Sequence, residues 1–258
     1  MNNRIEAAFA DKKAFIPFLT CGDPDGALTL ELVLAMAEAG ADIIELGIPF
    51  SDPIAEGPVI QQADERALKA GFTLHSFFQL VRDIRALTAI PLVCMTYLNP
   101  VYHYGKERFL IDASLAGLDG IIIPDLPYEE RDEIAQACND NQIVRINMVS
   151  PTSKDRIAEV ASNSEGFLYC VSSMGVTGMR SAIDDTAQAM VASAKQATST
   201  PCAVGFGIHT QHQARSIARF ADGVIVGSSI VDLVARHGRN SVEEVRRYVR
   251  SMKEAIND

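Results

Sequence analysis

The acidic groups that could carry chemistry are concentrated in one segment, ADIIELGIPFSDPIAEGPVIQ at residues 41–61, which holds Glu45, Asp52 and Glu56. Glu45 lies inside an apolar run, IIELGI at residues 43–48. A carboxylate in a hydrophobic strand is costly to bury unless a partner or a catalytic purpose keeps it there. Enzymes use one buried acid beside one loop acid to transfer protons in both directions. The segment therefore predicts an active site for general acid–base chemistry.

The stretch that follows Glu45 is predicted to be a loop. Pro49, Pro53, Gly57 and Pro58 interrupt it, and so many breakers do not allow regular structure. Prolines also restrict the loop to a few conformations. We expect this loop and residues 175–180 to act as mobile lids over the site.

Three glycine-rich turns late in the chain indicate a phosphate-binding site. They are GVTG at residues 175–178, GFG at 205–207 and GSS at 227–229, and each follows a strand-like run. Glycine lets the backbone approach an anion closely, and a helix N-terminus offers free N–H groups. One such turn alone would be explained as a tight turn, but three after consecutive strands favour phosphate binding. The turns contain no Lys or Arg, so backbone amides and Ser228 are expected to hold the anion.

The elements that position these residues alternate between strands and helices along the whole chain. Short apolar runs predict strands at residues 14–20, 43–47, 91–97, 120–124, 142–149, 166–171, 202–206 and 223–227. Helical patterns predict helices at residues 27–39, 58–70, 74–87, 129–139, 155–161, 184–197, 210–220, 230–235 and 242–256, with Thr73 and Ser241 among the expected N-caps.

Eight strands in this length give a mean spacing of about 32 residues, which is typical of a βα unit. No linker or charge block divides the chain, so we expect a single domain over residues 1–258. The fold class predicted is α/β, a (β/α)8 TIM barrel with an extra N-terminal helix and a short phosphate-binding helix after strand eight. Catalytic groups of such a barrel lie at the C-terminal ends of the strands. Asp23 and Asp125 are also found there, but a loop-stitching role explains them better.

Composition excludes several classes of function. A net charge of −10 argues against binding to nucleic acid or to an anionic membrane. No apolar run reaches the roughly 18 residues of a membrane helix, and the first residues lack the apolar core of a signal peptide. The five cysteines form no CxxC pair and the histidines do not cluster, which predicts a reducing cytoplasm and no metal site.

With these features placed, the chain closely resembles the tryptophan synthase alpha chain family from about Phe15 to Val234. The resemblance is carried by FIPFLTCGDP at residues 15–24, ELGIPFSDPIAEGPVIQ at 45–61, GVTG at 175–178, GFGI at 205–208 and VGSSIV at 226–231. The family is a lyase of tryptophan biosynthesis that cleaves indole-3-glycerol phosphate to indole and glyceraldehyde 3-phosphate. It passes the indole to a beta chain that carries pyridoxal phosphate.

The resemblance also assigns roles to individual residues. It implies that Glu45 protonates the indole ring carbon, that Glu56 takes the proton from the indole nitrogen, and that Tyr169 is an active-site tyrosine. The family usually has aspartate at the position of Glu56, so the reach here is longer by about 1.5 Å. The implied substrate-binding residues are Phe18, Ile60, Tyr97, Thr177, Gly178, Phe206, Gly207, Gly227 and Ser228.

The resemblance implies no cofactor on this chain and an alpha2–beta2 assembly with a beta chain. Docking is expected through the loops at residues 50–54 and 99–105, the second of which carries Val101, Tyr102 and Tyr104. Two alternatives remain open from the sequence. One is a lyase that performs the same reaction alone, and the other is a weakly catalytic barrel that binds phosphate and activates a beta chain.

Overall fold

A computed structural model describes residues 4–172, 180–205 and 207–258. One sheet of parallel strands runs through it, in the order β5-β4-β3-β2-β1-β9-β8-β7-β6. The strands are β1 Ala14–Thr20, β2 Ile44–Gly47, β3 Leu92–Met95, β4 Gly120–Ile122, β5 Val144–Arg145, β6 Met148–Val149, β7 Leu168–Val171, β8 Cys202–Gly205 and β9 Gly223–Val226.

The two ends of this sheet meet in one segment of the chain, which closes the ring. The single strand predicted at residues 142–149 is wrong in detail, because the structure divides it into β5 and β6. The first half pairs with β4 and the second half pairs with β7. The Ile146 N–H donates to the carbonyl of Ile121, whereas the Asn147 carbonyl accepts from Tyr169, both at 2.9 Å. The predicted (β/α)8 barrel is therefore confirmed, with its fifth strand split where the chain changes neighbours.

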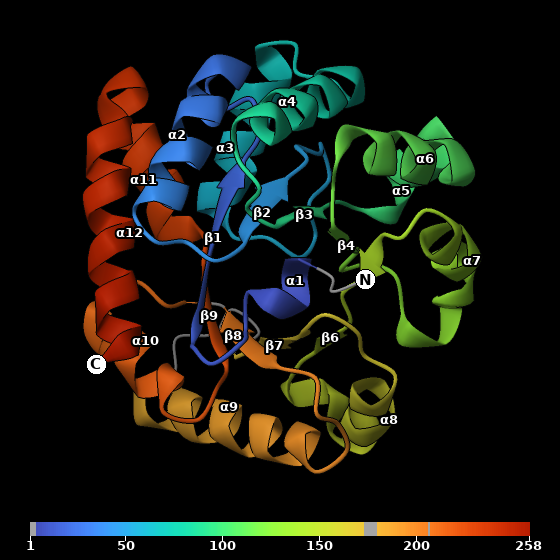
Figure 1. The fold of residues 1–258 in the computed structure, drawn as a ribbon, viewed down its shortest axis with the longest axis vertical. Coiled ribbons are helices and arrows are strands. Elements are labelled where there is room, and N and C mark those ends of the chain that lie inside the picture. Colours follow the sequence, from blue (N-terminus) through green and yellow to red (C-terminus); the bar gives the residue numbers. More distant parts are fainter. Residues whose placement is uncertain (1–3, 173–179, 206) are drawn as a thin grey trace.

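Helices surround this ring of strands (Figure 1). They are α1 Arg4–Ala7, α2 Gly26–Glu38, α3 Pro58–Lys69, α4 Leu74–Leu87, α5 Leu98–Tyr104, α6 Lys106–Ala116, α7 Asp132–Asp140, α8 Ile157–Ser162, α9 Arg180–Lys195, α10 Gln211–Ala218, α11 Ser228–His237 and α12 Ser241–Asn257. Short 3-10 turns lie at Tyr128–Glu130, Pro151–Arg156 and Gly238–Asn240.

Most of the helix predictions agree with these bounds, and the differences have local causes. Thr73 caps α4 as expected, because its hydroxyl accepts the Ser76 N–H at 3.2 Å. Ser241 is not the cap of α12 but its first residue, with Asn240 before it. The loop predicted at residues 99–105 is also wrong, because most of it is helix α5. A proline in the first turn of a helix is compatible with helix formation, and Pro100 lies there.

Alternation along the strands separates two apolar layers. In β2, Ile44 and Leu46 belong to the large core between the strands and the outer helices. Ile43 instead belongs to the smaller cluster inside the barrel. Because successive side chains in a strand point to opposite faces, Glu45 shares the inner face with Ile43. The local pattern of β2 therefore directs the carboxylate into the barrel.

Helix α1 covers the N-terminal end of the strands, where Figure 1 shows it lying across the ring. Ile5 and Ala8, in and just after this helix, join the inner cluster. A side chain at Gly120 would place its Cβ 2.9 Å from Cδ1 of Ile5, so the glycine makes room for the helix. The predicted N-terminal helix is confirmed, and it leaves the C-terminal ends of the strands as the place for a site.

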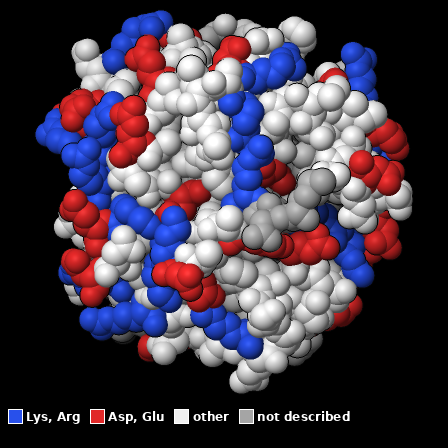
Figure 2. All heavy atoms as spheres, in the orientation of Figure 1, with Lys and Arg blue, Asp and Glu red and all other residues white. Residues whose placement is uncertain are grey.

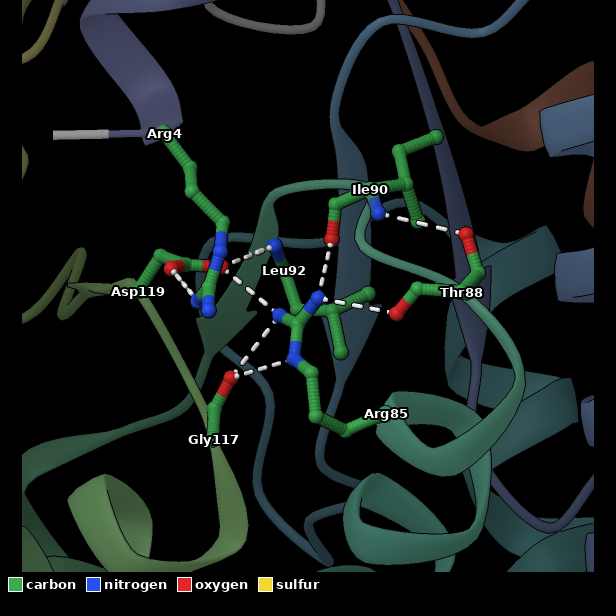
Figure 3. Close-up of polar contacts among 7 residues, drawn as sticks. All are labelled: Arg4, Arg85, Thr88, Ile90, Leu92, Gly117 and Asp119. Atoms are coloured by element: carbon green, nitrogen blue, oxygen red, sulfur yellow. Dashed lines mark hydrogen bonds and ion pairs between the residues drawn. The ribbon is translucent and has the colours of Figure 1, made fainter. Parts of the chain in front are cut away.

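Charged groups at the N-terminal end are paired. Asp42, Asp119 and Asp222 each precede a strand, and each accepts a hydrogen bond of 2.7–2.9 Å from the backbone of the neighbouring strand. Asp119 shows the full arrangement (Figure 3): its carboxylate binds Arg4 at 2.7 Å and Arg85 at 2.8 Å. Elsewhere on this side of the molecule, acidic and basic side chains are interspersed (Figure 2).

Candidate active site

Glu45 lies in the middle of β2, paired in register with Phe18 of β1 and Val93 of β3. The side chain is 1% exposed, and its Oε2 atom has no hydrogen-bond partner among the described residues. Burial raises the pKa of Glu45 from 4.5 to about 8. The physical cause is desolvation, because a charged carboxylate loses its water without gaining a cation. Glu45 is therefore an acid that carries its proton at neutral pH.

Tyr169 reaches the same interior from the opposite side of the barrel, on β7. Burial raises its pKa well above the usual range, and the nearby charge of Glu45 raises it further. Its hydroxyl lies over Gly205 of β8, where a Cβ would be 2.6 Å from the hydroxyl oxygen. The glycine is needed there for a tyrosine to extend across the sheet. The structure thus brings the predicted Tyr169 and Glu45 into one electrostatic environment.

The acidic loop is held against the barrel by Tyr97, which precedes α5. The Tyr97 hydroxyl accepts the backbone N–H of Ala55 at 3.0 Å. Its ring stacks on Phe50, with the ring centroids 5.1 Å apart. On the other side, the Gln61 amide of α3 donates to the carbonyl of Glu56 at 2.8 Å. Tyr97 therefore fixes the loop that carries the second acid, in addition to its predicted role in the indole pocket.

Glu56 is partly buried, and its Oε2 atom is enclosed without a hydrogen-bond partner within the described part of the chain. The pKa of Glu56 is raised overall: burial raises it most, the interaction with Asp64 lowers it in part, and the charge of Glu45 raises it further. The charge of Glu56 in turn contributes to the raised pKa of Tyr97. Glu45, Glu56, Tyr97 and Tyr169 are therefore brought together as predicted.

Asp64 is a member of this group that the sequence analysis missed. It lies on the buried face of α3 beside Ala63 and Ala67, and it is 3% exposed. A signal was present in the sequence, because Ile60, Ala63 and Ala67 have the spacing of one helix face and Asp64 falls on that face. An acid in a buried helical stripe requires an explanation in the same way as an acid in a buried strand.

The predicted apolar pocket is centred on Phe18. Phe18 and Ile60 pack in one cluster with Ala63 of α3 and Val231 of α11. A Cβ at Gly47 would lie 2.5 Å from Cζ of Phe18, and this glycine ends β2. The Phe18 ring therefore occupies the space that a side chain at Gly47 would fill. Phe206, also predicted for this pocket, lies outside the described residues.

The predicted phosphate end is partly described. Gly227 precedes α11, and a Cβ there would lie 3.1 Å from Phe18. Ser228 is the exposed first residue of that helix, so its hydroxyl and the first N–H groups are available to an anion. Gly207 has φ +71, and nothing lies within 4 Å of the position of its Cβ. Thr177 and Gly178, together with most of the predicted lid at residues 175–180, lie outside the described residues.

Two further acids stitch loops to the barrel. The Asp23 carboxylate accepts two hydrogen bonds from Arg66, one from Nε at 2.8 Å and one from Nη2 at 2.7 Å. This pair connects the loop after β1 to α3. Asp125 accepts the Leu98 N–H at 2.9 Å at the start of α5. The prediction that these two residues have structural roles is confirmed.

The expected docking residues differ in exposure. Ile54 in the acidic loop is 81% exposed and Tyr102 of α5 is 48% exposed. Val101 is buried, and Tyr104 packs against Phe78 with ring centroids 5.5 Å apart. Of the three aromatic and apolar residues of α5 that were expected to face a partner, Tyr102 is exposed, Val101 is buried and Tyr104 is half-buried.

The described residues offer neither a metal-binding cluster nor a membrane-spanning helix. Among residues 4–172, 180–205 and 207–258, no group of three or more His, Cys, Asp or Glu side chains could hold a metal ion. Over the same ranges, no helix is both long and apolar enough to cross a membrane.

Comparisons with known proteins agree on one family. A family model described as tryptophan synthase alpha chain matches residues 6–257. A protein named tryptophan synthase alpha chain from Lacticaseibacillus casei is 45% identical over 254 residues, covering 98% of this chain and 96% of that protein. A tryptophan synthase structure from Mycobacterium tuberculosis superposes with a TM-score of 0.91 at 34% identity and covers 100% of both chains. A structure of the tryptophan synthase α2β2 complex from Pyrococcus furiosus has a TM-score of 0.87 at 38% identity, covering 93% of this chain and 98% of that one.

Proposed function

Because the chain belongs to the tryptophan synthase alpha chain family, we propose that it is a lyase that cleaves indole-3-glycerol phosphate into indole and glyceraldehyde 3-phosphate. The observation that carries the assignment of roles is the burial of Glu45, whose pKa of about 8 keeps a proton available at neutral pH. A retro-aldol cleavage of this substrate requires an acid at the ring carbon, because the indole must first become an electron-accepting imine.

In the first step, Glu45 gives its proton to the ring carbon that carries the glycerol chain. Glu56 takes the proton from the ring nitrogen at the same time, so the ring becomes an imine without a net change of charge. This assignment requires a protonated Glu45 and an ionised Glu56. Two hydrogen bonds support the position of Glu56 in this step. Gln61 donates to the backbone carbonyl of Glu56, and the Ala55 N–H donates to Tyr97, so the loop that carries the acid is held against the barrel.

In the second step, the carboxylate left on Glu45 accepts the proton of the glycerol hydroxyl next to the breaking bond. The carbon–carbon bond breaks, the hydroxyl carbon becomes the aldehyde, and the electron pair returns to the ring. The ring nitrogen then recovers its proton from Glu56. Both acids return to their starting states, which is the requirement for a catalytic cycle.

The substrate is positioned by the residues around this pair. The indole ring is proposed to lie against Phe18, Ile60, Tyr97 and Phe206. The phosphate is proposed to bind at Thr177, Gly178, Gly207, Gly227 and Ser228, where the N-terminus of α11 favours an anion. Tyr169 borders the pocket beside Glu45.

The chain itself is proposed to use no cofactor, with pyridoxal phosphate on a partner beta chain. We further propose a cytoplasmic enzyme, which the five free and buried cysteines support. The P. furiosus relative has been solved as an α2β2 complex whose subunits activate each other. The exposed Ile54 and Tyr102 offer this chain a comparable docking surface beside the acidic loop.

The test is steady-state cleavage of indole-3-glycerol phosphate by the purified chain, with and without a beta chain. We expect slow cleavage by the chain alone and a higher rate in the complex, because docking against the acidic loop would complete the site. Absence of cleavage in both conditions would contradict the lyase assignment. If no complex forms and the rate stays unchanged, the stand-alone lyase is the better description. A complex that activates the beta chain without cleavage would favour the weakly catalytic activator.

A further inference from the structure

Asp64 has no role in the mechanism described above, although it is one of the most buried charged residues of the molecule. Of the seven buried side-chain atoms without a hydrogen-bond partner in the described part of the chain, four belong to this end of the barrel: Thr20 Oγ1, Glu45 Oε2, Glu56 Oε2 and Asp64 Oδ2. Buried polar atoms are normally satisfied. Four orphans gathered at one place indicate a group of atoms that lacks a proton or a ligand.

The surroundings of Asp64 explain two of these orphans. Its carboxyl lies within hydrogen-bonding reach of the Glu56 carboxyl, and each group shifts the pKa of the other. Two carboxylates are both acceptors, so such a bond exists only when one of them carries a proton. A single proton held between the two carboxyls therefore satisfies oxygens that otherwise have no partner.

Among the described side chains, no cation acts on Asp64 to stabilise two negative charges here. The groups that influence Asp64 are Glu56 from the loop, the backbone N–H of Phe50 and the side chain of Thr20, and none is basic. The one arginine of α3, Arg66, uses its guanidinium to bind Asp23. The other titratable groups that feel the charge of Asp64 are Tyr97 and Cys21, which are neutral at pH 7. Like charges at short distance without a cation cannot both ionise, which is the physical basis of carboxyl pairs that share a proton.

We propose that Asp64 is a positioning residue for this reaction, whose carboxyl holds a proton against the Glu56 carboxylate and so fixes the place and the charge of that base. The proposal rests on the proposed function for its kinetic consequences. The pair contains one proton and one negative charge before the reaction. When Glu56 accepts the proton of the ring nitrogen, an N–H bond breaks, an O–H bond forms and the pair becomes neutral. The proton on Asp64 stays in place throughout.

The directions of the pKa shifts agree with a proton on Asp64 and a negative charge on Glu56. Burial, the charge of Glu56 and the hydrogen bond from Glu56 raise the pKa of Asp64 to about 9. The pKa of Glu56 is raised as well, by burial above all, and the interaction with Asp64 offsets part of that rise. Asp64 is thus the member that keeps the proton, and Glu56 is the member that is free to act as a base.

The interaction with Asp64 also restrains the side chain of Glu56, which is longer and more mobile than the aspartate usual in the family. Glu56 has one more rotatable bond than an aspartate and more rotamer freedom, and a misplacement of about 1 Å can reduce a rate on the order of a hundredfold. The Glu56 backbone is held by Gln61, but that contact does not restrain the carboxyl group. A hydrogen bond from Asp64 on the rigid helix α3 restrains the carboxyl itself.

Two variants of similar size separate this role from packing. Asp64→Asn keeps an N–H donor for Glu56, whereas Asp64→Leu keeps the volume without a donor. We expect Asp64→Leu to lower kcat about tenfold to a hundredfold, since that is the effect of a lost hydrogen bond to a charged group. In the Asp64→Leu variant, the acidic limb of the kcat–pH profile should also move to higher pH. The reason is that Glu56 loses the hydrogen-bond donor that stabilises its charged form. Asp64→Asn should retain kcat within a few-fold and keep the acidic limb, and KM should change little in both.

A second measurement does not depend on activity. Carbon NMR of the protein with 13C-labelled aspartate carboxyls should show one aspartate that titrates near pH 9. This signal should be absent in Asp64→Asn and should move to lower pH in Glu56→Gln. Glu65→Gln, on the exposed side of the same helix, is the control and should leave both readouts unchanged.

The outcomes are distinguishable. Equal losses of kcat in the Asn and Leu variants, or no change in either, would overturn the proposal. A wild-type protein without an aspartate that titrates above pH 7 would also overturn it. If the wild type shows this signal but cleaves no substrate alone or with a beta chain, the shared proton stands and the proposed reaction fails. Should Asp64→Leu not fold, the NMR titration and Asp64→Asn decide the question.

Discussion

Buried carboxylates at the two ends of the barrel differ in whether they have cations and hydrogen-bond donors as partners. At the N-terminal end, Asp42 is bound by Lys12 at 2.7 Å and by Lys253 at 2.6 Å, and it also accepts the N–H of Phe15. Toward the C-terminal end, Glu45 is even more buried, 1% exposed against 8% for Asp42, and its Oε2 atom has no hydrogen-bond partner among the described residues. Both residues belong to the same short stretch of chain, three positions apart. Their environments differ because Asp42 precedes β2 at the N-terminal end of the barrel, whereas Glu45 lies within β2 and points into the barrel.

The difference separates structural charges from functional ones. A buried carboxylate with two cations and a backbone N–H recovers much of the free energy that it lost on leaving water. A buried carboxylate without partners can persist only at a cost to stability, and such groups cluster at active sites. Exposure alone does not distinguish Asp42 from Glu45, whereas the count of partners does.

The largest effect is expected from Glu45→Gln, which keeps the size of the side chain and removes the titrating group. General acid–base groups contribute about 10²–10⁴ in rate, so kcat should fall by that factor with little change in KM. Steady-state cleavage of indole-3-glycerol phosphate measures it. A variant that retains more than a tenth of the wild-type turnover would remove Glu45 from the role of proton donor.

Asp119→Asn tests the opposite end. The carboxylate joins Arg4, Arg85 and the N–H of Leu92, and removal of one partner of a buried ion pair costs about 3–5 kcal/mol. We expect a loss of about 3 kcal/mol in the free energy of unfolding, measured by urea denaturation, with kcat and KM unchanged in the folded protein. A large loss of kcat at normal stability would contradict the separation of the two ends.

The pH dependence of stability should distinguish Glu45 from the paired aspartates. The pKa of Glu45 in the folded state, about 8, lies above its value of 4.5 in the unfolded chain. The folded state therefore holds the proton more tightly, and this contribution is fully present below pH 4.5 and is lost as the pH rises to about 8. Each pKa unit corresponds to about 1.4 kcal/mol, so the wild type should lose on the order of 4 kcal/mol relative to Glu45→Gln between pH 5 and pH 9.

That experiment compares urea denaturation of wild type and Glu45→Gln at pH 5 and pH 9. The two proteins should have similar stabilities at low pH, and the variant should be the more stable one at high pH. A constant difference at all pH values would show that Glu45 is not buried with a raised pKa.

The smallest effect is expected on the outer surface, where charges are neither buried nor catalytic. Glu65 and Lys69 of α3 form an exposed i,i+4 pair at 3.2 Å. Such pairs contribute about 0.3–0.5 kcal/mol, so Glu65→Gln should change the free energy of unfolding by no more than about 0.5 kcal/mol. Thermal and urea denaturation check this, and a loss above 1 kcal/mol would show that surface charges matter more than the comparison allows.

Much of the fold could be predicted because its signals are local. Helix α4 was predicted with its observed ends at residues 74–87, since Thr73 caps it and an apolar face runs through it. The division of residues 142–149 between β5 and β6 could not be predicted. Periodicity shows that a strand is present, but it does not show that its two halves pair with different neighbours.

The candidate site shows the same limit. Glu45 was predicted from an acid in an apolar strand, which is a local pattern, whereas the proline-rich loop offered both Asp52 and Glu56 and the family resemblance singled out Glu56. Asp64 was missed because a single acid on a helix is usually solvated, and only the packing of α3 against β1 buries it. The catalytic and substrate-binding roles of all the candidate residues remain predictions, and Thr177, Gly178 and Phe206 also lie outside the described residues.

The amino-acid order alone determines the alternation of strands and helices, the inward direction of Glu45 and the close approach allowed by the glycines, because these depend on neighbouring residues. The tertiary structure decides which carboxylates meet a cation and which meet only one another. Asp42 gains Lys253 from 211 positions away, whereas the carboxyl of Glu56, among the described residues, interacts with the carboxyls of Asp64 and Glu45 and with no cation. Desolvation and pairing depend on what surrounds a group in space, so the chemistry of each carboxylate is defined only when the barrel closes.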